Sequence, residues 1–138
     1  MKISAQVRNG GGEHHITLLT NDRASGLSIA PKPGGGGSSV NGGELLFLAL
    51  ATCYCNDVYR EAAKRGISVR NLEVFVEGEF TAEGAAARNV SYRAKVTAEG
   101  SEAEIKALLE HTDRVAEVQN TLRSGIPVAL SSVEVVLG

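Results

Sequence analysis

Apolar residues follow two different periods along the chain, and their longest run marks a central helix. Between residues 45 and 55 only Thr52 is polar, which predicts a helical segment that protein covers on every side. Asn41 and Glu44 have the spacing of a capping box, and Gly66 suits a left-handed helix end. We therefore predict one long helix that begins after Asn41 and ends near Gly66.

The N-terminal segment shows the alternation of extended strands. The runs Ile3–Val7 and His15–Thr20 flank the turn sequence Asn9–Gly12, which predicts a β-hairpin. A shorter run at Gly26–Ala30 predicts a third strand. The glycine-rich stretch Pro31–Ser39 then leads into the helix, and two interpretations are open: a connector or lid, or an anion cradle. We favour the connector, because no Gly-Lys-Ser/Thr follows.

After the helix, the period changes to two. Leu72–Phe80 carries acidic residues at its outward positions, and Val90–Thr97 carries basic residues at its own. Opposite charges on neighbouring outward faces favour an antiparallel pair with one face on the core and one in water. We predict a long hairpin here.

The C-terminal third predicts a helix followed by a strand. Ser101 and Glu104 form a second capping box, and the apolar stripe continues to Leu122 with a bend near residues 111–113. The apolar residues from 128 to 137 predict a closing strand with a bulge near Ser131–Ser132.

Together these elements predict a single α+β domain over residues 1–138, with antiparallel sheets around a long helix. The chain has 138 residues, of which 43% are hydrophobic, enough for one sizeable core. Six strands of this length do not cover an all-apolar helix on every side. We therefore expect a second copy of the chain, in a homodimer, to complete the cover.

Charge and hydropathy exclude several classes of protein. A net charge of -2 without a basic run argues against nucleic-acid binding. No apolar stretch is long enough to span a membrane, and the first eight residues lack the apolar core of a secretory signal. We expect a cytoplasmic protein with neither nucleic-acid nor membrane partners.

Cys53 and Cys55 are the only cysteines. Two residues on a helix turn about 200°, so their sulfurs point to opposite sides and do not form a disulfide. His14, His15 and His111 do not assemble into a recognisable metal set. We predict no cofactor and no metal.

Three segments carry a resemblance to a known family. Asn-Gly-Gly-Glu-Leu-Leu-x4-Ala-Thr-Cys ends at Cys53, Ala-Ala-Lys-Arg-Gly ends the helix, and Asn-Thr-Leu-Arg-Ser-Gly-Ile-Pro-Val spans 120–128. The chain resembles the OsmC/Ohr family of osmotically induced and organic hydroperoxide resistance proteins over almost its whole length. The resemblance implies an OsmC-like fold, an intertwined homodimer, and thiol peroxidase activity on organic hydroperoxides at the subunit interface.

The family's site residues carry over only in part. Cys53 stands at the position of the peroxidatic cysteine, but Ala116 and Glu117 replace the resolving cysteine and the proline after it. The family's catalytic glutamate falls on Gly43, and the nearest acid is Glu44.

The family's activating arginine lies on the N-terminal hairpin, where Arg8 or Arg23 could stand in. The resemblance therefore implies a catalytic set of Cys53 with Glu44 and one of these two arginines.

The chemistry requires a thiolate, and a free thiol with a pKa of about 8.5 is mostly protonated at neutral pH. Cys53 is too far from the helix start for the dipole to help, so a cation from elsewhere must approach it. Glu44 lies about 13 Å along the helix from Cys53, so it serves chiefly as the cap, with orientation of an arginine as the alternative.

Other residues of the helix leave two interpretations open. Cys55 is interpreted as an inert packed thiol rather than a substitute redox group. Tyr54, Asn56 and Asp57 could line a pocket, but Asn56 and Asp57 more simply mark where the helix emerges into water.

Two functions remain. The first is a peroxidase in which Cys53 is oxidised by a hydroperoxide and an external thiol reductant completes the cycle. The alternative is a non-catalytic dimer that binds a small apolar or anionic ligand in its cleft. The presence of an arginine beside Cys53 would discriminate between them.

Overall fold

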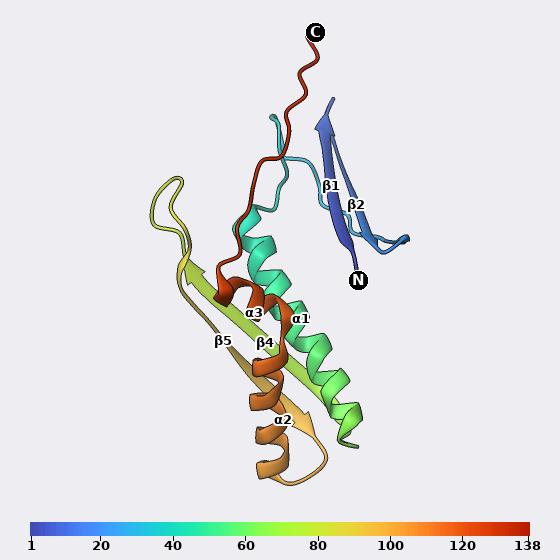
Figure 1. Cartoon of the computed structure of the whole chain (residues 1–138), viewed down its shortest axis with the longest axis vertical. Helices are drawn as coiled ribbons and strands as arrows, with labels where there is room; N and C mark the ends of the chain where they lie inside the picture. The colour runs from blue at the N-terminus through green and yellow to red at the C-terminus, as the bar shows by residue number, and fades with distance from the viewer. The chain divides into compact units, whose positions relative to one another are not determined.

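A three-stranded antiparallel sheet opens the computed structural model, which describes residues 1–138. It contains β1 (Ile3–Gly10) and β2 (Glu13–Thr20), both labelled in Figure 1, followed by β3 (Arg23–Ser25), in the order β1-β2-β3. The predicted hairpin is confirmed. The predicted strand at 26–30 is wrong, because a tight turn with Asn21 at φ 53° folds the chain back at once and pairs 23–25 with 18–20.

The glycine-rich segment after β3 is an ordered turn. A bridge joins Pro31 to Ser38, and the amide of Asn9 clamps the backbone of Gly37 at both ends. Its Nδ2 donates to the Gly37 carbonyl at 3.0 Å, while its Oδ1 accepts from the Gly37 N–H at 3.1 Å. The interpretation as a connector fits this arrangement, since β1 itself holds the turn in place.

The long helix α1 spans Gly42–Lys64. At its start the side chains and backbone N–H groups of Asn41 and Glu44 bond reciprocally, at 2.8 and 3.1 Å. At its end Gly66 has φ +66°, and Ile67 N–H bonds back to the carbonyl of Ala62 at 3.0 Å. Both predicted caps are confirmed.

Two long strands follow α1 as an antiparallel hairpin, β4 (Val69–Glu79) and β5 (Arg88–Ala98). Glu73 faces Lys95 in the register, and Arg93 lies 3.7 Å from Glu77. The predicted charge pairing is therefore present, although exposed ion pairs of this kind contribute little stability.

The C-terminal helical region consists of α2 (Glu102–Val115) and α3 (Glu117–Ser124). Ser101 caps α2 by accepting from Glu104 N–H at 3.1 Å, as predicted. The bend predicted at 111–113 is misplaced. The helix breaks at Ala116, whose backbone is extended with ψ 115°, and Asn120 Nδ2 donates to the freed carbonyl of Arg114 at 2.9 Å.

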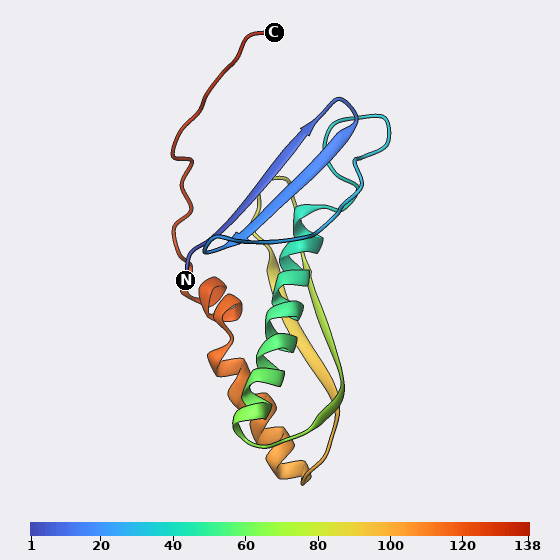
Figure 2. The ribbon, with the colours of Figure 1, turned by 90° about the vertical axis from the view of Figure 1, so that its right-hand side faces the viewer.

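Helices α1 and α2 pack on one face of the β4–β5 hairpin (Figures 1 and 2). The centre of this core consists of Tyr54, Val58, Ala62 and Leu108, all at most 3% exposed. The hydroxyl of Tyr54 donates to the carbonyl of Leu109 at 2.8 Å, so its one polar atom is paired. The α+β class with antiparallel sheets is confirmed.

Contacts group the chain into two compact units, Met1–Leu46 and Phe47–Gly138. The assignment of residues 1–138 to one domain stays a prediction. No helix of the structure is both long and apolar enough to cross a membrane.

The single chain leaves part of the apolar half of α1 exposed, as expected, and its cover by a second copy stays a prediction. Leu50 and Tyr54 are buried, whereas Leu48 is 53% exposed. The closing strand predicted over 128–137 is wrong. No strand of the chain pairs with this segment, and its apolar side chains, including Val128, Leu130 and Leu137, stay almost fully exposed.

Gly78 on β4 has no room for a side chain, because the side chains of Phe47 and Val90 lie where a Cβ would be. A Cβ at this position would lie 2.8 Å from Phe47 Cζ and 2.9 Å from Val90 Cγ2. We expect Gly78→Ala to lower the free energy of unfolding by about 1 to 3 kcal/mol, because such overpacking forces neighbours to shift.

Denaturant unfolding at a fixed protein concentration measures this effect. Gly42→Ala is the matched control, because a Cβ there meets nothing within 4 Å. Alanine at this helical position is expected to be neutral or mildly stabilising. Equal stability of the two variants would contradict the close packing at Gly78.

Candidate functional site

The thiol of Cys53 lies where α1 meets the start of α3, and it is partly exposed. Its Sγ lies 3.5 Å from Asp57 Oδ2, one turn further along α1, and 3.9 Å from Glu117 Oε2 at the start of α3. Both separations are within the range of sulfur hydrogen bonds. The site is thus a thiol facing two carboxyl groups.

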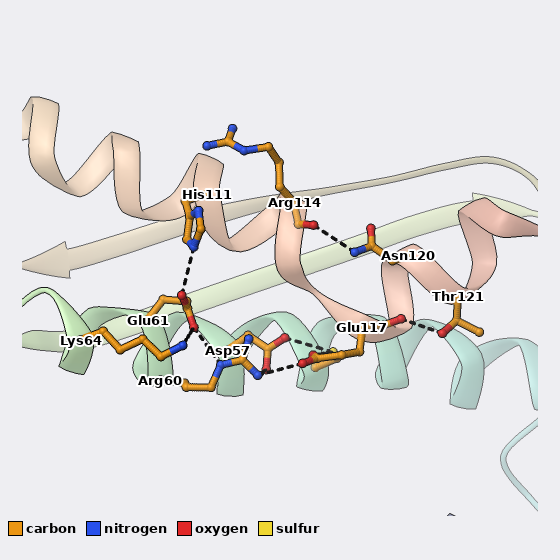
Figure 3. Close-up of polar contacts among 10 residues, drawn as sticks. Asp57, Arg60, Glu61, Lys64, His111, Arg114, Glu117, Asn120 and Thr121 are labelled. Carbon is orange, nitrogen blue, oxygen red and sulfur yellow. Dashed lines mark hydrogen bonds and ion pairs between the residues drawn. The ribbon is translucent and has the colours of Figure 1, made fainter. Parts of the chain in front are cut away.

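Arg60 ties these two carboxyl groups together from the other side. Its Nη1 lies 3.1 Å from Asp57 Oδ1 and 2.9 Å from Glu117 Oε1 (Figure 3). Each carboxyl group therefore has one oxygen on the guanidinium and the other toward the sulfur. Asp57 is only 7% exposed, so a charge there needs such a partner.

The surroundings of Cys53 oppose ionisation of its thiol. Burial raises the pKa of Cys53 above its usual range, and the negative charges of Asp57 and Glu117 raise it further. A hydrogen bond from the Val118 backbone N–H acts in the opposite direction but does not reverse the shift. At neutral pH this sulfur is therefore a thiol.

The two carboxyl groups differ from each other. Burial and the neighbouring Glu117 raise the pKa of Asp57, and Arg60 only partly offsets them. The pKa of Glu117 is lowered, mainly by side-chain hydrogen bonding between it and Asp57 and by its own backbone N–H, with Arg60 adding to the effect. Asp57 is thus the better proton acceptor of the pair.

A third carboxyl group, that of Glu61, anchors α1 to α2 one turn further on. One oxygen accepts from Lys64 Nζ and Arg60 Nε, both at 2.9 Å, and the other lies 3.0 Å from His111 Nε2 (Figure 3). Hydrogen bonds from Lys64, Arg60 and His111 lower the pKa of Glu61 to about 2.

This depressed pKa predicts a loss of stability in acid. A carboxyl group whose pKa is lower in the folded state contributes stability above its unfolded pKa and loses it as the pH falls through the folded value. We expect the Glu61 contribution to decline between about pH 5 and pH 2.

Glu61→Gln is therefore expected to be less stable than the wild type at pH 7, and to approach it at about pH 2. Urea unfolding across this range measures the difference. Glu110→Gln, on the exposed side of α2, is the control and should parallel the wild type. A constant gap between Glu61→Gln and wild type at all pH values would contradict the assignment.

A polar cluster fixes the break that places Glu117 beside Cys53. Tyr92 on β5 donates to Asp113 Oδ1, and Arg123 donates to the same oxygen at 2.6 Å and to the Asp113 carbonyl at 3.1 Å. Although burial acts to raise the pKa of Asp113, hydrogen bonds from Tyr92 and Arg123 hold it low. Asp113 of α2 thereby connects β5, through Tyr92, with α3, through Arg123, on the two sides of the break.

The predicted site residues other than Cys53 do not lie in the polar group around its thiol as recorded. Glu44 fills its role as the cap of α1, and its alternative role in orienting an arginine stays a prediction. Arg8 lies on β1 and Arg23 on β3, both exposed, in the N-terminal unit. The assignment of either to Cys53 also stays a prediction.

Within the unit that contains Cys53, the interpretation of Asp57 changes and two further residues join the site. Asp57 was expected to emerge into water but is buried at the site. Arg60 and Glu117 were not predicted as functional residues at all. Cys55 is a free, half-buried thiol, consistent with the expected absence of a disulfide.

Sequence spacing contained a signal for part of this set. Cys53, Asp57 and Arg60 occupy positions i, i+4 and i+7, so they share one face of α1. Glu117 is 64 residues away from Cys53, and only the break at Ala116 brings it there.

Three donor atoms of Cys53, Asp57 and Glu117 lie within 4.8 Å of one another, a set that a metal ion could use. Arg60 already neutralises both carboxylates from their outer oxygens. The Arg60 guanidinium thus supplies to the acidic pair the positive charge that a metal ion would supply.

The chain matches a known protein family and several solved structures. A family model described as OsmC-like protein matches residues 35–131. No curated protein matches the chain.

Three solved structures share the fold at low sequence identity. An OsmC-like protein from Mycoplasma pneumoniae aligns with a TM-score of 0.62 and 20% identity, covering 91% of each chain. A Legionella pneumophila protein, described as organic hydroperoxide resistance protein OsmC and predicted redox protein, aligns with 0.59 and 21%, covering 89% of this chain and 90% of that one. An OsmC-like protein of unknown function from Vibrio cholerae aligns with 0.60 and 16%, covering 88% and 93%.

Proposed function

Because this chain belongs to the OsmC-like protein family, we propose that it is a thiol-dependent peroxidase that reduces organic hydroperoxides through Cys53. The structure from Legionella pneumophila, described as an organic hydroperoxide resistance protein, supports this proposal at the level of the fold. The observation that carries it in this chain is the Cys53 thiol, which is partly exposed and has an accepting carboxyl oxygen at 3.5 Å.

The proposed cycle uses one cysteine and an external reductant. Cys53 takes the outer oxygen of the hydroperoxide and becomes a sulfenic acid, releasing an alcohol. One reductant thiol then displaces water to give a mixed disulfide, and a second thiol releases Cys53 and a disulfide product. Ala116, fully buried, stands where the family's resolving cysteine would be, so no internal disulfide replaces the external thiol.

The charges around Cys53 determine how the proposed peroxidase activity depends on pH. Since burial and two carboxylates raise the pKa of Cys53, the thiolate fraction is small at neutral pH and grows as the pH rises toward that pKa. We expect peroxidase activity to increase through the alkaline range up to the pKa of Cys53.

Separate cysteine variants test the function. Cys53→Ser is expected to lose peroxide-dependent consumption of thiols down to the uncatalysed background, and Cys55→Ser is expected to keep it. Both side chains are partly buried thiols on the same helix, so the second variant is a matched control. Lack of thiol consumption by the wild type, with cumene hydroperoxide and any common monothiol or dithiol up to pH 9, would exclude the peroxidase.

We further propose a homodimer in the cytoplasm. The exposed Leu48 on α1 and the uncovered apolar segment 126–138 are surfaces that a second copy would bury. A reducing compartment supplies the thiols that a one-cysteine peroxidase consumes.

A second candidate function is a non-catalytic dimer that holds a small apolar or anionic molecule. A hollow of about 250 Å³ beside Cys55 favours an apolar rather than an anionic ligand. It is lined by Ala51, Thr52, Cys55, Asn56, Leu72 and Val74. Retention of a bound apolar compound together with no thiol consumption would select this function over the first.

A further inference from the structure

We propose that Asp57, paired with Glu117 and held by Arg60, accepts the thiol proton of Cys53 as its sulfur attacks the peroxide, and returns that proton to the leaving oxygen. This role rests on the proposed peroxidase function. It assigns the proton transfer to residues outside the family's own catalytic set.

Geometry gives each carboxyl group two separate tasks. Asp57 Oδ1 and Glu117 Oε1 lie on the Arg60 guanidinium at 3.1 and 2.9 Å, which fixes their orientation. The remaining oxygens, Asp57 Oδ2 and Glu117 Oε2, lie 3.5 and 3.9 Å from Cys53 Sγ. A general base must lie within hydrogen-bond reach of the proton it removes, and Asp57 does.

The recorded contacts of Arg60 go to carboxyl groups and not to the sulfur of Cys53. Its Nη1 serves Asp57 and Glu117, and its Nε bonds Glu61 Oε2 at 2.9 Å. The charged groups that face Cys53 are Asp57 from α1 and Glu117 from α3, both negative, with Arg60 on their far oxygens. At neutral pH, where little thiolate is present beforehand, a sulfur in these surroundings reacts by giving up its proton during the attack.

The two carboxyl groups are matched to such a transfer. Asp57 is buried and has the higher proton affinity of the pair, while Glu117 stays ionised beside Arg60. A base whose proton affinity lies nearer the operating pH both accepts and donates more readily. Asp57 therefore suits a proton that moves on within one reaction step.

Cys53 S–H and R–O–O–H give Cys53 S–OH and R–OH. The S–H and O–O bonds break and an S–O bond forms, so sulfur is oxidised by two electrons and the peroxide is reduced by two. The thiol proton passes to Asp57 Oδ2 and then to the alkoxide oxygen of R–O⁻, leaving the carboxylate as it began.

Opposite effects on pKa and rate test this role. In a Cys55→Ser background, Asp57→Asn and Glu117→Gln each remove a negative charge, so the pKa of Cys53, read from thiolate ultraviolet absorbance, is expected to fall in both. If the pair handles the proton, sulfenic acid formation with cumene hydroperoxide at pH 7 nevertheless slows, by about 10²-fold for Asp57→Asn. Glu117→Gln is expected to slow it less, because Asp57 remains.

Glu117→Gln keeps the test valid should Asp57→Asn fold poorly, since the Glu117 side chain is 65% exposed. Glu110→Gln on α2 is the charge-matched control and should change neither quantity. Variants that react as fast as the wild type at pH 7, or faster in step with their larger thiolate fraction, would overturn the proton role alone. A wild type that forms no sulfenic acid even at pH 9 would overturn the peroxidase, and this role with it.

Discussion

Leu108→Ala is expected to lower the free energy of unfolding by about 2 to 5 kcal/mol, because it leaves a cavity at the centre of the core. Leu108 is fully buried on α2 and packs against Tyr54, Val58 and Ala62 of α1. These residues are held between the helices and the β4–β5 hairpin, so the surroundings have little freedom to collapse into the gap. Equilibrium denaturation at one protein concentration measures the loss.

Lys106→Ala is the control for this core variant. It lies on the same helix but is exposed, and alanine is a good helix former, so a change within about 0.5 kcal/mol is expected. A loss under 1 kcal/mol for Leu108→Ala would show that α2 does not pack on α1 as described.

Replacing Val133 and Val135 by lysine is expected to convert a dimer into a monomer. Both side chains are more than 70% exposed in the single chain, and both belong to the C-terminal segment that the proposed second copy covers. Burial of a valine stabilises by about 1.5 to 3 kcal/mol. Since about 1.4 kcal/mol is tenfold in affinity, the double variant should raise the dissociation constant more than a hundredfold.

Light scattering at micromolar concentration measures the mass of the particle. Ser132→Lys with Glu134→Lys adds lysines at the alternate positions and should keep the two-chain mass. A one-chain mass for the wild type would contradict the homodimer. A two-chain mass for the valine variant would show that this segment lies outside the interface.

Features decided by neighbouring residues were predictable from the sequence. The Asn41–Glu44 cap and the Gly66 end depend on contacts within a few positions, and both occur as expected. The β4–β5 hairpin was predictable for a related reason, since alternation identifies the buried face and charge identifies the partner. The strand expected at 26–30 failed because the Asn21 turn, and not hydropathy, sets where pairing resumes.

The site was harder to predict, because it combines local and distant residues. Asp57 and Arg60 share a helix face with Cys53, yet the charge of Asp57 suggested solvent rather than a buried carboxyl group. Glu117 was known only as the residue in place of a proline. Its position depends on the break at Ala116, which Tyr92, Asp113 and Arg123 hold through contacts between distant segments.

The buried methyl group of Ala116 also bears on how such a peroxidase would be inactivated by its own substrate. With no second sulfur on α2 or α3, an oxidised Cys53 stays open to further attack until a reductant arrives from solution. A further equivalent of peroxide would then carry it to the sulfinic acid, which ordinary thiols do not reverse. The protein would thus lose activity permanently in proportion to the ratio of peroxide to reductant around it.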